Sequence, residues 1–367
     1  MKDSTIKLKV NGKEYSGWLS VSISSSLQSL ARTFSVSTAI DRNHNEVRDI
    51  EIGDAVEVYI GEDKVLTGYV TQRSISLSER SLSVSVSGAS KTIDLDQCSL
   101  PDGSATSYKS QTHATNLKSV CSPYRIEVVD EVKNTTKCDF EIKPTDKIGD
   151  AIVDYLKKHG LLVGDDEEGR LVIRDIGSGG TVENAITEGS YVSSSRKRNA
   201  DKIFSEYVMV GQSTNATSEL STSANQSKAV EKNVSVTRPR TQTVQVSGNV
   251  SATSLRKRVA MQRDVSIGAS DSASFTMTGW RQQNGGLWKI NQLVKIQDDM
   301  LGLDVEWLIT SVNFEISNGG TLVSIDCQSP LAFKNCVIAD DTKAKAQDFS
   351  DIKSGSGNAS GTSWTKS

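Results

Sequence analysis

Three histidines, five cysteines and three acidic clusters are the groups of this 367-residue chain with the widest chemical reach. Histidine and cysteine can ligate a metal or form a nucleophilic pair, and two carboxylates can together cleave a glycosidic bond. Each of these chemistries requires that the groups meet in space. The groups are His44, His113 and His159, then Cys98, Cys121, Cys138, Cys327 and Cys336, then Asp94 with Asp96, the run from Asp165 to Glu168, and Asp298 with Asp299.

The spacing of these groups along the chain favours neither catalysis nor metal binding. No cysteine lies in a Cys-x-x-Cys pair, which argues against a zinc knuckle and against a redox motif. The acidic clusters border predicted turns, where solvated carboxylates are common, and residues 165–168 lack the ligand alternation of an EF-hand loop. His159 lies in the last turn of a predicted helix, where a cation complements the helix dipole.

Sequence motifs of established enzyme classes are also missing. The chain contains no Gly-x-Ser-x-Gly, His-Glu-x-x-His, P-loop or dinucleotide-binding fingerprint. We therefore expect a protein that is not an enzyme, without catalytic residues, cofactor-binding residues, cofactors or metal ligands.

Composition indicates a folded, weakly acidic protein. Hydrophobic residues make up 36% of the chain, enough for a core, and the formal net charge of -3 does not favour nucleic acid as the main ligand. The basic runs 196–198 and 256–258 are too short for a nucleic-acid groove. The sequence has no apolar run of about 18 residues and no apolar N-terminal stretch. We expect a soluble protein made in a reducing cytoplasm, without stable membrane insertion.

Strict alternation of apolar and polar residues is the strongest structural pattern. Such alternation puts the apolar side chains on one face of a strand, which is typical of antiparallel sheets with one dry and one wet face. Asn11-Gly12 between two such runs predicts a tight hairpin. The fold class is therefore mainly β with minor α (α+β). Serine or threonine fills most of the polar places in residues 19–24, 73–78, 82–87, 234–237, 244–247 and 275–278.

Three helices are expected. One spans about 112–121, and a second is capped by Thr145 or Asp146, carries one apolar stripe and stops at Gly160. A third begins after Ser251, with Leu255 facing inward. A short hairpin is predicted at 161–174.

An internal repeat connects the two ends of the chain. Residues 52–60, 66–76 and 81–86 share their pattern with residues 290–296, 308–317 and 321–325. An upstream strand at 34–40 has its expected counterpart at 204–210. We interpret the repeat as two similar small antiparallel β-barrels, the second of which is split by an insertion, plus two smaller α/β subdomains.

The repeat and the composition together predict the domain organisation. Residues 212–233 are expected to form a long exposed loop, and Trp364 lies alone in a polar tail. The expected domains are a first β-barrel at 1–93, a small α+β domain at 94–188, a split second β-barrel at 189–213 and 287–335, an inserted β-rich subdomain with one helix at 214–286, and a flexible tail at 336–367.

The order of several short segments resembles one family. Residues 53–70 and 86–98 look like the baseplate hub protein of Mu-like contractile-tailed phages, also called the 43 kDa tail protein family. The resemblance covers about residues 5–335 and rests on the order of the segments, because none of them is catalytic. Further matching segments are Phe204 to Tyr207, Arg238-Pro239, the helix around Leu255 to Arg263, Gly279-Trp280 and Gly286 to Trp288.

The resemblance implies structural work in the virion tail baseplate, after assembly in the bacterial host cytoplasm. Hubs of this family are homotrimers with two barrels per chain, which form a ring of six around a channel. Such a ring adapts the sixfold tail tube on one face to the trimeric spike on the other, and DNA passes through it without specific binding. The alternatives are the hub part of a type VI secretion-like spike and a carbohydrate-binding tail module.

Overall fold

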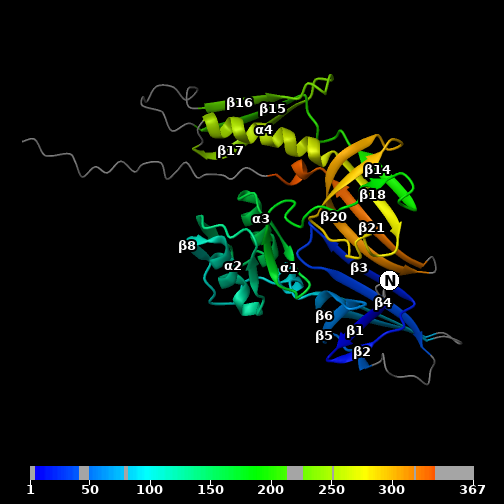
Figure 1. Cartoon of the computed structure of the whole chain (residues 1–367). Helices are drawn as coiled ribbons and strands as arrows, with labels where there is room; N and C mark the ends of the chain where they lie inside the picture. The colour runs from blue at the N-terminus through cyan, green and yellow to red at the C-terminus, as the bar shows by residue number, and fades with distance from the viewer. Residues whose placement is uncertain are drawn as a thin grey trace, which may run out of the picture.

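The computed structural model describes residues 5–40, 49–77, 82–212, 226–249, 252–317 and 320–334 (Figure 1). His44, Cys336, Trp364 and the tail expected at 336–367 lie outside these residues. So does most of the loop expected at 212–233, although its last part is described and forms a strand. No helix in the described ranges combines the length and the apolarity needed to cross a membrane.

The protein is mainly β, as the sequence predicted, and has four α-helices in the described residues: the three expected ones and a short helix at Ile93–Gln97 that was not expected. Its main feature is one sheet of 13 strands, which contains both copies of the repeat. Among the described strands neither copy closes into a barrel of its own, so the expectation of two separate closed barrels is not confirmed. Three small sheets of two or three strands complete the β structure.

The first copy opens with the predicted hairpin. Val10 pairs with Lys13 across the turn, and Asn11 and Gly12 both have positive φ, of 49° and 84°, as a type I′ turn requires. Along Ile6–Val10 and Ala55–Ile60, buried apolar residues alternate with residues that are half-buried or exposed, which leaves one dry face. The strands are β1 (Ile6–Val10), β2 (Lys13–Tyr15), β3 (Ser20–Ser26), β4 (Thr33–Ile40), β5 (Ala55–Ile60), β6 (Asp63–Leu77) and β7 (Leu82–Ser90).

The second copy repeats the pairing of the first. The order β14-β18-β21-β20-β19 matches β3-β4-β7-β6-β5, and the long strands β6 and β20 each carry a bulge, before Gln72 and before Ser311 respectively. Aligning the bulges makes Val56 equivalent to Val294, as the sequence predicted. The strands are β13 (Ile186–Thr187), β14 (Ser193–Arg198), β18 (Asp271–Thr278), β19 (Leu293–Asp298), β20 (Leu303–Ser317) and β21 (Gly320–Gln328), followed by η3 (Pro330–Phe333).

One strand of the repeat was assigned wrongly from the sequence. The counterpart of β4 is β18, which pairs with β21, and not the segment 204–210. That segment forms β15 (Glu206–Gln212), between β16 (Gln226–Lys232) and β17 (Thr241–Asn249) in a separate sheet covered by α4 (Ala252–Ala269) (Figure 1). The expected domain boundaries at 213/214 and 286/287 therefore do not coincide with the limits of the two sheets. The reason is that a period-two pattern does not identify the strand with which a segment pairs.

The α/β subdomain lies beside the junction of the two copies (Figure 1). The side chain of Thr112 caps α2 by accepting from the backbone N–H of Thr115. The long helix begins after Lys147, which makes no side-chain cap, so the predicted caps Thr145 and Asp146 are wrong, while the stop at Gly160, with φ of 73°, is confirmed. Its elements are α1 (Ile93–Gln97), β8 (Ser107–Thr112), α2 (His113–Cys121), η2 (Ser122–Tyr124), β9 (Val128–Asp130), β10 (Lys137–Glu141), α3 (Ile148–Lys158), β11 (Leu162–Asp165) and β12 (Leu171–Arg174).

The two copies are joined by backbone pairing between β3 and the second half of β20. Phe314 lies opposite Ile23, and Ile316 lies opposite Val21. Buried apolar residues of both copies belong to one continuous core. The two copies therefore form one structural unit with a shared core, and not two separate domains.

A charge at either equivalent core position should strongly destabilise the protein. Val56 and Val294 are 1% and 0% exposed, so Val→Asp at either buries an unpaired carboxylate and should cost about 3–5 kcal/mol. Ser85→Asp on the hydroxyl-bearing face of β7, where Ser85 is half-buried, should be much milder. Chemical denaturation of the three variants checks this, and equal midpoints for all three would contradict the assignment of faces.

Candidate functional site

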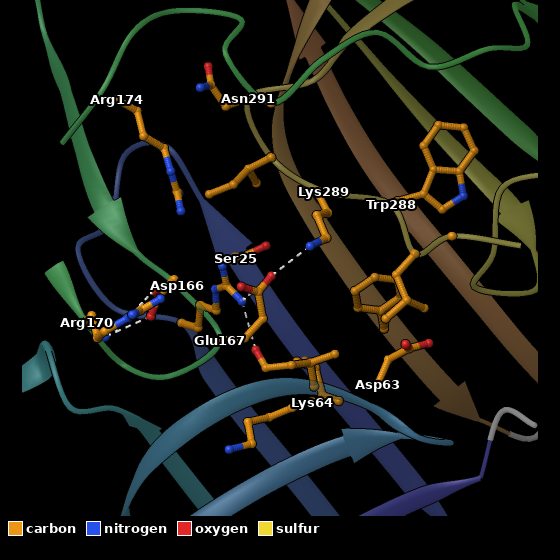
Figure 2. A pocket seen from close by; sticks show the side chains of 18 of the residues that line it. Ser25, Asp63, Lys64, Asp166, Glu167, Arg170, Arg174, Trp288, Lys289 and Asn291 are labelled. Atoms are coloured by element: carbon orange, nitrogen blue, oxygen red, sulfur yellow. Dashed lines mark hydrogen bonds and ion pairs between the residues drawn. The ribbon is translucent and has the colours of Figure 1, made fainter. Parts of the chain in front are cut away.

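A charged cavity of about 780 Å³ lies where the two copies and the α/β subdomain meet (Figure 2). The loop before β4 contributes Arg32, and the start of β6 contributes Lys64. The β11–β12 turn contributes Asp166 and Glu167, while Lys289 comes from the second copy. Three parts of the chain that are far apart in sequence thus face one another across this cavity.

Arg32 is the central cation of the cavity. Its Nε lies 3.1 Å from Oδ1 of Asp165, and its backbone N–H donates to Oδ2 of the same carboxylate at 3.1 Å. Its guanidinium also donates to the carbonyl oxygens of Val65 and Asp165. The two side chains are only 11% and 3% exposed, so this ion pair is shielded from solvent. Arg32 thereby connects the first copy to the hairpin of the α/β subdomain.

The expectation that residues 165–168 form a solvated turn is wrong for its first two members. Asp165 and Asp166 are 2% and 6% exposed. Burial raises the pKa of the Asp165 carboxyl, and Arg32 opposes that shift. Asp166 accepts from Nε of Arg170 at 2.7 Å. A turn rich in carboxylates is expected to be exposed to solvent, but the start of this turn is buried between the first copy and the α/β subdomain.

Glu167 connects the subdomain to both copies. Its carboxylate lies 3.4 Å from Nη1 of Arg32 and accepts from Nζ of Lys289 at 3.1 Å, which Figure 2 shows. Burial alone raises the pKa of Glu167, but Arg32 and Lys289 outweigh it and lower that pKa to about 2. The carboxylate is therefore ionised at neutral pH and takes part in both ion pairs.

Close backbone contact fixes the same turn against β6. Oγ1 of Thr67 donates to the carbonyl oxygen of Glu167 at 2.8 Å. Gly169 has φ of 72°, and a Cβ there would lie 2.5 Å from the carbonyl oxygen of Thr67. A side chain at this position would push the turn away from β6, so the joint requires glycine.

The charges that line this cavity are paired within the chain. Among its described residues, each lysine and arginine has an acidic partner at ion-pair distance, so the charges satisfy one another. Arg174 pairs with Glu131, and Lys64 pairs with Glu57 and Glu168. The chemical role of this arrangement is to fix the relative positions of three parts of the chain.

The remaining candidate groups lie elsewhere. Asp94 and Asp96 are in the short helix α1, and burial raises the pKa of Asp94. Asp298 is buried at the end of β19, where it accepts from the Tyr191 hydroxyl and the backbone N–H of Leu301, so it is not a solvated turn residue, whereas Asp299 is exposed. The thiols of Cys121 and Cys327 are buried, and burial raises the pKa of both.

His113, His159 and Cys138 meet inside the α/β subdomain, which their spacing in sequence did not reveal. The centroids of the two imidazole rings are 4.6 Å apart. Burial, and to a smaller extent Lys158, lowers the pKa of His159 and so favours its neutral imidazole.

Two strand edges form a second candidate site. Among the described strands, β14 pairs only with β18, and the last part of β6 pairs only with β7. On that part of β6, Ile75 and Leu77 are 47% and 67% exposed. Their equivalents in the second copy, Phe314 and Ile316, are covered by β3. Ile75 and Leu77 therefore lie on an exposed apolar edge that no described strand pairs.

Acid should loosen the ion pairs of the cavity through Glu167. Its folded pKa is about 2 against 4.5 ordinarily, so its contribution to stability is present above pH 4.5 and lost as pH falls towards 2. Glu167→Gln should lower the melting temperature at pH 7, and this difference from the unaltered protein should shrink as pH approaches 2. Glu168→Gln, at a 53% exposed side chain, is the control with a smaller effect at pH 7. A difference that is constant with pH would contradict the assignment.

Comparison with known proteins connects this architecture to phage tails. Residues 5–90 match the model of the Mu phage baseplate assembly protein GpP-like N-terminal domain, residues 92–175 the baseplate hub protein gp44-like second domain, and residues 251–335 the Mu phage GpP fourth domain. The baseplate hub protein gp44 of Escherichia phage Mu is 24% identical over 316 residues, which are 84% of this chain and 83% of that protein.

Solved structures have the same fold. The 43 kDa tail protein of prophage MuSo2 from Shewanella oneidensis is 28% identical, with a TM-score of 0.80 over 90% of this chain and all of that one. A tail protein from Neisseria meningitidis MC58 is 22% identical, with a TM-score of 0.76 over 90% of this chain and 99% of that one. Three successive domain matches, a relative aligned along most of its length and this structural likeness agree, and the chain belongs to the family of Mu-like phage tail baseplate hub proteins.

Proposed function

We propose that three copies of this chain form the ring of a baseplate hub, which joins a sixfold tail tube to a trimeric spike and surrounds the DNA channel. The virion tail baseplate is its place of action, after assembly in the host cytoplasm. The observation that carries the proposal is a difference between equivalent strand edges. Inside the chain, β3 pairs with β20. The equivalent strands, β14 and the last part of β6, each have an edge that no described strand pairs.

The internal joint provides the geometry for the external one. Within the chain, β3 of the first copy pairs with β20 of the second. The equivalents of these strands are β14 and β6, and the edges that would complete their pairing are open among the described strands. A second copy of the chain can therefore place its β14 against the free part of β6. Unpaired strand edges favour this kind of addition.

The register of the internal joint predicts the register between chains. Matching the bulges of β6 and β20 makes Ile75 equivalent to Phe314 and Leu77 equivalent to Ile316. Their partners on β3, Ile23 and Val21, have Arg196 and Ser194 as equivalents on β14. Ile75 should therefore lie opposite Arg196 of the partner subunit, and Leu77 opposite Ser194 of the partner subunit.

A head-to-tail joint of this kind generates either a closed ring or an open filament. If each joint turns the sheet by one sixth of a circle, three chains with two copies each close a ring of six. The α/β subdomain and the sheet containing β15 occur once per chain, so they add only threefold features. Such a ring has near-sixfold symmetry in its β structure, which suits a tail tube, and threefold symmetry elsewhere, which suits a trimeric spike.

The type VI alternative has support from the fold alone. An E. coli type VI secretion component, described as similar to the T4 tail proteins gp27 and gp5, is 11% identical, with a TM-score of 0.55 over 90% of this chain and 80% of that one. The matches to domains of Mu-like proteins favour a phage or prophage tail over a secretion spike for this chain.

The hydroxyl-bearing face of the large sheet is suited to line a channel for DNA. On strands β3, β4, β7, β14, β18 and β21 and on β20 from Ser311 onward, the charged side chains of this face are Lys197, Glu315 and Asp326, which do not form a basic stripe. A face with few cations releases few counterions when DNA approaches, so it should not hold DNA. Hydrogen bonds on this face join Ser22 to Asn313, Ser35 to Ser87, Thr276 to Ser324 and Ser274 to Asp326.

Light scattering at micromolar concentration should give a mass of three times 39.6 kDa. The double variant Ile75→Lys, Leu77→Lys puts two cations on the free edge of β6, one of them opposite Arg196 of the partner subunit, and should prevent assembly. The monomer should still fold, because both side chains are exposed in the single chain. Val234→Lys, at a 92% exposed residue outside both edges, should leave the trimer intact. A monomeric unaltered protein would refute the ring, and a closed dimer or tetramer would refute only the number three.

Duplex DNA should bind weakly to the trimer. In a filter-binding assay at low salt, we expect no submicromolar affinity, because the proposed channel face lacks a run of phosphate-binding cations. Tight binding that disappears with added salt would show that separate basic residues assemble into a groove, and it would exclude a passive channel.

A further inference from the structure

Three metal-binding side chains converge in the α/β subdomain from three different elements. His113 is the first residue of α2, Cys138 lies in β10, and His159 follows the last residue of α3. One ligand atom from each side chain lies within 4.8 Å of the other two. Sγ of Cys138 and Nδ1 of His159 are 3.9 Å apart. We propose that these three residues bind a thiophilic divalent cation of the Zn²⁺ class.

The donor set and the spacing both suit such an ion. Two imidazoles and a thiolate are the ligands of borderline and soft cations such as Zn²⁺, whereas Mg²⁺ and Ca²⁺ prefer oxygen. Zn–N and Zn–S bonds of about 2.0–2.1 and 2.3 Å place tetrahedral ligands about 3.3–3.6 Å apart. The sulfur–nitrogen distance of 3.9 Å is only a few tenths longer. The other ligand separations, which reach at most 4.8 Å, would have to shorten as the side chains close on the ion.

The three side chains differ in their access to solvent. His113 is buried, while Cys138 and His159 are half-buried, which gives a cation a path from solvent.

A hydrogen-bond network orients the buried imidazole. Nδ1 of His113 lies 2.8 Å from the Tyr155 hydroxyl, which accepts from Nδ2 of Asn116 at 2.9 Å. A partner on one ring nitrogen is what fixes a metal-bound histidine, and it leaves the other nitrogen for the cation. Oδ1 of Asn116 is buried without a hydrogen-bond partner among the described residues. A water bound to the cation is the kind of donor that this oxygen lacks.

The bound cation would fasten α2, β10 and the end of α3 to one another. These elements surround the same core as the hairpin that carries Asp165, so the cation would also stiffen the subdomain that the ion pairs of the cavity hold. Binding to the folded state alone stabilises it. The role that we infer is structural, and it is independent of the proposed ring.

Metal titrations of the full-length protein test the site. The protein is stripped with a chelator, then titrated with Zn²⁺ against a chromophoric competitor and with Co²⁺, whose thiolate charge-transfer band reports a metal–sulfur bond. One equivalent per chain should bind and raise the melting temperature. Cys138→Ser should weaken Zn²⁺ binding by more than about tenfold and remove the band. Cys98→Ser changes a thiol of similar exposure outside the cluster and should retain both.

A second measurement uses the unaltered chain and avoids any effect of a substitution on folding. Zn²⁺ should protect Cys138 from alkylation by iodoacetamide and leave Cys98 as reactive as before, as mass spectrometry of peptides can show. The proposal is overturned if the protein binds no stoichiometric Zn²⁺, if Cys138→Ser keeps full affinity and the cobalt band, or if Zn²⁺ fails to protect Cys138.

Discussion

The buried ion pair between Arg32 and Asp165 fixes the first copy against the α/β subdomain, and Glu167 extends this contact to the second copy through Lys289. A charge in a dry joint is costly unless its partner is present in good geometry, and loss of one partner leaves the other uncompensated. Here the guanidinium, a backbone N–H and two carbonyl oxygens supply that geometry. A displaced subdomain would break the pair and leave its charges uncompensated, so the contact favours the observed orientation.

The second constraint is the backbone pairing of β3 with β20, which merges two similar copies into one sheet with one core. When two copies of a unit pair edge to edge within one chain, each copy still has one outer strand edge whose backbone groups have no neighbouring strand. Soluble proteins usually protect such edges with charge, bulges or short strands. In this chain β14 carries Arg196, Lys197 and Arg198, whereas the free part of β6 shows apolar residues. The two edges differ in character, which favours head-to-tail contact over contact between identical edges.

Local patterns in the sequence determined much of the secondary structure. The Asn11-Gly12 turn needs no distant partner, and the apolar stripe of α3 is a property of 11 consecutive residues. The equivalence of Val56 and Val294 was also visible, because both copies keep the same alternation around a strand. Family membership followed from the order of such segments along the chain.

The tertiary structure alone decided which strands pair and which polar groups meet. The sequence assigned β15 to the repeat instead of β18, since alternation encodes the face of a strand but not its neighbour. Asp165 looked solvated because its burial depends on Arg32, 133 residues away. The cluster of His113, Cys138 and His159 could not be predicted from the sequence for the same reason. Ligand spacing in a sequence indicates a metal site only when the ligands lie in one local element. Pairing, ion pairs and clusters arise from contacts between distant segments, and the free energy that selects them is a property of the whole fold.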